Sequence, residues 1–171
     1  DMISFWLNIK SKKRIQLINI FLSKRKDQTS LFLKNRFEMN DLHISCIEQN
    51  ESKLIEMTNT NNIDINSKDK KGNTPLHLTC IIGNTNIFNH LIFKGSDIHS
   101  KGEHEMTPLH IACQKGNIDI VKLLISNGSN INEKDKNGMT PLHFACEYGH
   151  IDIVELLISK ILDILPLSKI P

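Results

Sequence analysis

The sequence predicts an all-α solenoid, a fold in which short helical hairpins stack on one another. The tetrapeptide Thr-Pro-Leu-His occurs three times at a spacing of 33 residues, at positions 74–77, 107–110 and 140–143. The residues around each copy repeat as well, since Met106–Gly116 aligns with Met139–Gly149. A period of this length is typical of stacked helical units, which offer an extended surface and no ready-made catalytic pocket.

Each repeat is expected to begin with a short first helix. Threonine is a favourable N-cap, and proline at the first helical position tolerates the missing backbone donor. A glycine suited to a left-handed cap follows each helix, at Gly83, Gly116 and Gly149. The repeated tetrapeptides are therefore assigned structural roles: Thr74, Pro75, Leu76, His77, Thr107, Pro108, Leu109, His110, Thr140, Pro141, Leu142 and His143.

A second, amphipathic helix is expected to follow each first helix. Ile118, Val121 and Leu124 fall at helical spacing, and a glycine at 95 or 128 ends the corresponding segment. A hairpin this short cannot bury its apolar stripe alone, so it must stack on its neighbours.

This pattern resembles the ankyrin repeat family, in which Asp-x-x-Gly-x-Thr-Pro-Leu-His-x-Ala recurs. The resemblance implies helix-turn-helix units joined by β-turn loops called fingers. A partial unit at Asn40–Asn50 keeps Leu-His-x-x-Cys but lacks Thr-Pro and the glycine, and we interpret it as a first, atypical repeat. The expected ankyrin domain covers residues 39–171, with a partial repeat at 39–70 and repeats at 71–103, 104–136 and 137–169, the last with a divergent end.

The N-terminal segment, residues 1–38, differs in charge from the rest of the chain. It carries nine Lys and Arg against three Asp and Glu, whereas residues 39–171 carry twelve against sixteen. A basic helix with an apolar side at Ile15–Leu22 is expected. We favour helices that cap the open end of the array. A basic amphipathic segment on an anionic membrane and a nuclear-import or nucleic-acid patch are the alternatives.

The cysteines and several histidines follow the repeat. Cysteines at 46, 80, 113 and 146 hold the same place in successive units, and no Cys-x-x-Cys pair suggests a metal. The resemblance implies small buried residues there, so reduced, packed thiols are expected, which favours an intracellular location, in the cytoplasm or the nucleus. For His43, His77, His110 and His143, the resemblance implies rings that hydrogen-bond backbone and tie one finger to the next.

Catalysis is not expected. The sequence has no nucleophile paired with a base, no phosphate-binding glycine loop and no metal-ligand spacing. We therefore predict no catalytic residues, no metal, no cofactor and no small-molecule substrate.

Three positions depart from the repeat. His90 stands where the next two copies have Leu123 and Leu156. It is expected to be a neutral histidine with one partner, and a ligand or pH-sensing role is the alternative. Finger 2 (residues 102–106) has Glu105 where the other fingers have glycine, so its turn must be strained or differently shaped. Neutral drift and remodelling of the finger for a partner are the two explanations. The segment Ile161–Leu165 replaces a polar loop. This segment suggests that the array is truncated here, that it continues in the native chain, or that it packs onto a partner. Exposure of the aliphatic residues would favour self-association.

The resemblance implies that a protein partner is bound by finger tips and by exposed first-helix positions on a concave face. An apolar centre is expected at Ile81, Ile82, Met106 and Tyr148, because aliphatic and aromatic anchors dominate interface energies. A non-catalytic scaffold or adaptor is the leading hypothesis, and the targeting or regulatory part of a larger enzyme or channel is the alternative. The full set of expected contacts is Lys70, Lys71, Asn73, Ile81, Ile82, His104, Met106, Gln114, Lys115, Lys136, Asn137, Met139, Glu147 and Tyr148.

Overall fold

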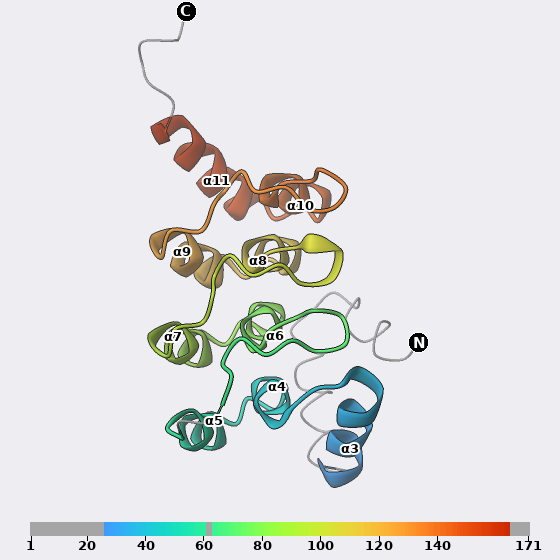
Figure 1. The fold of residues 1–171 in the computed structure, drawn as a ribbon. Helices are drawn as coiled ribbons and strands as arrows, with labels where there is room; N and C mark the ends of the chain where they lie inside the picture. The colour runs from blue at the N-terminus through green and yellow to red at the C-terminus, as the bar shows by residue number, and fades with distance from the viewer. Residues whose placement is uncertain (1–25, 61–62, 165–171) are drawn as a thin grey trace, which may run out of the picture.

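The computed structural model, which describes residues 26–60 and 63–164, confirms the all-α solenoid. Four helical hairpins stack in chain order, with first helices in one row, second helices in another and the fingers along one side (Figure 1). The first helices are α4 (Asp41–Ile47), α6 (Pro75–Ile82), α8 (Pro108–Lys115) and α10 (Pro141–Glu147). The second helices are α5 (Glu51–Thr58), α7 (Thr85–Phe93), α9 (Ile118–Ser126) and α11 (Ile151–Ile164). Helix α3 (Lys26–Phe37) precedes the array, and a 3-10 turn, η1 (Glu103–Glu105), lies in finger 2.

The first helices begin and end where the sequence predicts. Thr74 caps α6 in a capping box with His77, and the same box recurs at the start of α8 and α10. Gly83 ends α6 in the left-handed conformation, with φ at 84°. In the atypical first repeat, Asn40 caps α4 through a hydrogen bond from the His43 amide, and Gln49 takes a φ of 53° at the glycine's place. The upstream hairpin therefore forms without Thr-Pro or glycine.

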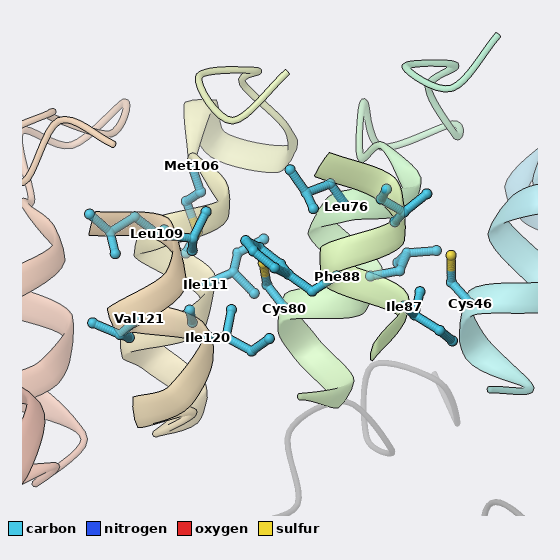
Figure 2. Close-up of a cluster of buried hydrophobic side chains, with 14 of the residues drawn as sticks. Cys46, Leu76, Cys80, Ile87, Phe88, Met106, Leu109, Ile111, Ile120 and Val121 are labelled. Atoms are coloured by element: carbon cyan, nitrogen blue, oxygen red, sulfur yellow. The ribbon is translucent and has the colours of Figure 1, made fainter. Parts of the chain in front are cut away.

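The core runs continuously through the array, between the two rows of helices. Side chains from successive repeats interleave there, as Figure 2 shows for Leu76, Phe88, Leu109 and Ile120, all of which are fully buried. Each hairpin thus buries its apolar side against its neighbours, which is the reason that stacking stabilises it.

The cysteines are free thiols, but they do not all have the same surroundings. Cys46, Cys80 and Cys113 are fully buried, and burial raises the pKa of Cys46 and of Cys113 to about 12, which keeps these thiols protonated and unreactive. Cys146 is exposed, so the expectation that it would be packed is wrong. The reason is its place on α10, where no further helix of the described part covers it.

Helix α3 packs against the first hairpin and against the finger at residues 69–73, which precedes α6 (Figure 1). Its Leu33 and Phe37 are buried, and the Phe37 carbonyl accepts a hydrogen bond from the Lys70 amide at 2.8 Å. At its other end, the Ser30 hydroxyl donates to Glu48 of the α4 C-cap at 3.2 Å. The helix expected at Ile15–Leu22 lies outside the described residues, so the role of residues 1–38 and the boundary after residue 38 stay predictions.

His90 lies half-buried on α7 with one hydrogen-bond partner. Its Nε2 is 2.7 Å from the Thr58 hydroxyl of α5, and burial, followed by the charge of Lys94, lowers its pKa. The Thr58 hydroxyl donates its proton to the Leu54 carbonyl at 2.9 Å and accepts from the imidazole. It therefore keeps its own acceptor when the imidazole is removed.

Replacing His90 with leucine is expected to raise the melting temperature by about 2–4 °C, because the apolar area gained outweighs one partly exposed hydrogen bond. Thermal unfolding followed by circular dichroism measures the effect. Asn89→Leu, at an exposed neighbour on the same helix, is the control and should give no gain. A fall in melting temperature for His90→Leu would show that the bond to Thr58 is the stronger contribution.

Candidate partner-binding surface

Histidines of the first helices hold the fingers in place. The Nε2 atom of His43 lies 3.0 Å from the Asn73 carbonyl, that of His77 lies 3.1 Å from the Met106 carbonyl, and His110 reaches Met139 in the same way. Each ring thus bridges one repeat to the finger of the next, as the resemblance implied for these three positions.

The tautomer of His77 follows from its partners. The Thr74 amide donates to Nδ1 at 3.1 Å, so Nε2 carries the proton and donates to the Met106 carbonyl. Burial lowers the pKa of His77 to about 4, so the ring stays neutral at physiological pH. The pKa of His110 is lowered for the same reason. His143 has the same threonine contacts, but its ring is exposed because no described finger follows it.

Fingers 1 (residues 69–73) and 3 (residues 135–139) have the tight turn that the sequence predicts. The Asp69 carboxylate accepts the amides of Lys71 at 2.9 Å and Asn73 at 2.8 Å, and Asp135 does the same in finger 3. Gly72 and Gly138 take φ values of 83° and 79°. These turns are held by hydrogen bonds from backbone amides to the Asp69 and Asp135 carboxylates, so their shape does not depend on the tip lysines.

Finger 2 has a different shape, as its missing glycine predicts. His104 and Glu105 both adopt left-handed backbone, with φ at 56° and 60°, within η1. Such conformations carry a strain cost for residues other than glycine. The finger is nevertheless anchored, because the His104 carbonyl accepts the Lys136 amide at 2.9 Å and the Asn73 side chain accepts the Glu103 amide at 3.2 Å. That the new shape serves a partner stays a hypothesis.

Charged side chains link the fingers to one another. Lys71 of finger 1 pairs with Glu103 of finger 2 at 3.2 Å, and Lys101 pairs with Glu133 at 2.9 Å and with Glu105 at 3.8 Å. The hydrogen bond from Lys101 lowers the pKa of Glu133. Finger 2 therefore presents acidic groups between two fingers that carry lysines.

The first-helix face consists of the residues at the C-terminal ends of three first helices. Adjacent helices are tied together here. The side-chain amide of Gln114 in α8 donates to the Tyr148 hydroxyl at the end of α10 at 3.3 Å, and the side-chain amide of Asn117, the N-cap of α9, donates to the Cys80 carbonyl of α6 at 2.6 Å. The members of this face are Ile81, Ile82, Gln114, Lys115, Glu147 and Tyr148.

Most of the predicted contact residues are accessible, but two are not. Asn73 and Met106 are buried, because the Asn73 amide joins two fingers and the Met106 side chain packs in the core (Figure 2). Met106 and Ile111 flank the Thr107 cap at the spacing of a hydrophobic staple, a signal in the sequence that indicates burial. The exposed residues are Lys70, His104, Lys136, Asn137 and Glu147, and the half-buried ones are Lys71, Ile81, Ile82, Gln114, Lys115, Met139 and Tyr148.

A shallow depression of about 530 Å³ beside finger 1 was not expected from the sequence. It is lined by Leu31, Phe32, Asn35 and Arg36 of α3 together with Lys70, and the two apolar side chains are largely exposed. The apolar run Leu31–Leu33, followed directly by the basic residues Lys34 and Arg36, was the available signal. Within residues 26–60 and 63–164, no three His, Cys, Asp or Glu side chains are placed to hold a metal ion, and none of the helices is long and apolar enough to cross a membrane.

Two comparisons place these features among known proteins. A family model described as ankyrin repeats (3 copies) matches residues 42–132 and 79–166. A stretch of 44 residues is 50% identical to the human SMC5-SMC6 complex localization factor protein 1. This match covers 26% of the chain and only 4% of the human protein.

Proposed function

This chain belongs to the ankyrin repeat family, whose members are general protein–protein interaction modules, and we propose that it acts as a non-catalytic scaffold or adaptor. In this proposal, a protein partner contacts the finger tips and the first-helix face together. The observation that carries the proposal is the histidine bridging, which fixes both surfaces to the same rigid stack.

Rigid presentation supports binding because a surface that is ordered before association loses little conformational entropy on binding. His77 and His110 tie each finger to the preceding first helix, and the Gln114–Tyr148 hydrogen bond joins two first helices. A partner would therefore meet a surface whose fingers and helices keep fixed relative positions.

We place the energetic centre at Ile82 and Tyr148, flanked by Ile81. All three are half-buried, and Ile81 and Tyr148 also pack against the core. Apolar anchors within a polar rim are typical of the few residues that dominate binding energy. Lys70, His104 and Lys136 at the finger tips and Glu147 beside Tyr148 supply that rim. Met106 is left out of this centre because it is buried.

Ile82→Glu and Tyr148→Glu are each expected to weaken partner binding at least about tenfold, since a charge at an apolar anchor costs roughly 1.4 kcal/mol or more. Partners can be captured on the immobilised domain, identified by quantitative mass spectrometry, and their affinities then measured by calorimetry with purified proteins. Phe93→Glu is the matched control, because Phe93 is 83% exposed on the opposite row of helices. Equal binding by all three variants, with unchanged circular dichroism, would refute this site.

A second candidate is that the array targets a larger protein to its location. The observation in favour is the human relative, which is named as a localization factor and is far longer than the stretch it shares with this chain. Both candidates use the same surface, and the length of the complete gene distinguishes them.

A further inference from the structure

Each second helix is joined to the next finger by a connecting loop, and successive loops contact one another along the array (Figure 1). We number them loop 1 (residues 64–68), loop 2 (residues 97–101) and loop 3 (residues 130–134). The third residue is Asn66 in loop 1 and Asn132 in loop 3, but His99 in loop 2. This single difference changes how loop 2 meets loop 3.

The asparagine of loop 1 bridges to the segment at the start of loop 2. Its Oδ1 accepts the Asp97 amide at 2.9 Å, and its Nδ2 donates to the Gly95 carbonyl at 3.4 Å. One carboxamide thus bonds the backbone groups on both sides of Ser96. A backbone donor and a backbone acceptor at this spacing form a slot that matches a primary carboxamide, which carries one group of each kind.

The equivalent slot between loops 2 and 3 is not filled by the array itself. Its backbone groups are the Asn130 amide and the Gly128 carbonyl, and neither makes a hydrogen bond in the part of the chain that the structure describes. The His99 ring is exposed and does not reach them. The two nitrogens of an imidazole point away from each other, so the ring cannot offer a donor and an acceptor side by side as a carboxamide does.

A pocket of about 240 Å³ lies at this place, lined by His99, Ser129 and Asn130 of the two loop segments and by Thr107 of the α8 cap. Ser129 is only 9% exposed, and its hydroxyl has no hydrogen-bond partner among the described residues. The Ser96 hydroxyl is unpartnered as well, so the open slot, and not the serine, distinguishes this pocket. Sites for small molecules usually measure roughly 300–1,000 Å³, so the pocket is better suited to a single side chain.

The charges at the pocket favour a neutral ligand. The Lys101 ammonium pairs with Glu133 at 2.9 Å and with Glu105 at 3.8 Å, so two carboxylates share one ammonium. A ligand carboxylate would be repelled by this net negative charge. A ligand ammonium has no acceptor for the Asn130 amide. A primary carboxamide avoids both problems, because it is neutral and has both a donor and an acceptor.

We propose that this pocket, the amide pocket, binds a primary carboxamide at the end of an asparagine or glutamine side chain of a protein partner. The ligand oxygen accepts from the Asn130 amide and the Ser129 hydroxyl, and the ligand NH₂ group donates to the Gly128 carbonyl. These contacts reproduce those of Asn66 one repeat earlier. That the occupant belongs to a protein rests on the proposed function. The pocket itself is separate from the first-helix face, because Thr107 lies at the opposite end of α8.

Titration of the ¹⁵N-labelled chain with N-acetylglutamine methylamide, followed by NMR, tests the proposal. The Asn130 amide resonance should shift and saturate. The corresponding glutamate and lysine derivatives carry the same backbone amides and should bind at least about tenfold more weakly, because each lacks the matched donor and acceptor. The absence of a saturable shift at Asn130, or equal affinity for the three derivatives, overturns the proposal.

Two variants of His99 provide a matched pair. His99→Asn supplies the carboxamide from within the array, as Asn66 does, so it should weaken binding of the glutamine derivative at least about tenfold and raise the melting temperature. His99→Ala removes the ring but leaves the slot open, so binding should persist. Undiminished binding in His99→Asn overturns the assignment. Ile82→Glu should not affect this titration, so a failure of the proposed partner surface and a failure of the amide pocket are distinguishable.

Discussion

His77→Ala is expected to lower the free energy of unfolding by about 4 kcal/mol. The substitution removes a fully buried ring that bonds the Thr74 amide and the Met106 carbonyl. Both backbone groups would lose their partner in a buried setting, where each unsatisfied group costs about 1–3 kcal/mol. The finger before α8 would also lose its tie to α6, so the damage extends across a repeat boundary.

His143→Ala is the matched control for this prediction. His143 has the same contacts with Thr140 in its capping box, but its ring is exposed and bridges to no described finger. Its loss should cost about 1 kcal/mol or less, the value of a helix cap. Urea unfolding of both variants measures the difference. Equal losses would show that the cap, and not the bridge between repeats, accounts for the role of these histidines.

Acidification from pH 6.5 to 4 is expected to destabilise the array by about 3 kcal/mol through His77 alone. The pKa of His77 is about 4 in the folded chain and 6.5 in the unfolded chain, so between these values the unfolded state binds more protons. Stability therefore rises with pH through this window and is lost as pH falls below 6.5. His110, whose pKa is also lowered by burial, acts in the same direction.

Urea titrations at pH 7.5, 6.5 and 5.5, above the range where exposed carboxylates titrate, measure this dependence. His77→Gln is the control, because glutamine offers hydrogen-bonding groups but does not titrate. In this variant, the unfolding free energy should change less with pH over the same range than in the wild-type chain. The difference in slope is up to about 1.4 kcal/mol per pH unit, which corresponds to one bound proton. A wild-type chain that is equally stable at all three pH values would contradict a neutral, buried His77.

Particular residues show how far sequence reasoning reached. Gly83 and Gly116 marked helix ends correctly, because a positive φ is a local requirement that few other residues meet. Glu105 at the place of a glycine correctly indicated a remodelled finger. Met106, in contrast, was expected at the surface and is buried, because assignment by repeat register overlooked its staple position directly before the Thr107 cap.

The sequence by itself determined the repeat unit, its two helices, their caps and the need to stack, because capping, left-handed glycines and helical spacing act within a few residues of one another. The tertiary structure alone decided which side chains at equivalent positions of successive repeats are accessible. Cys113 and Cys146 occupy the same place in the repeated segment Thr-Pro-Leu-His-x-Ala-Cys, yet one is fully buried and the other exposed. Burial depends on the neighbouring hairpin, and the last described hairpin has a neighbour on one side only.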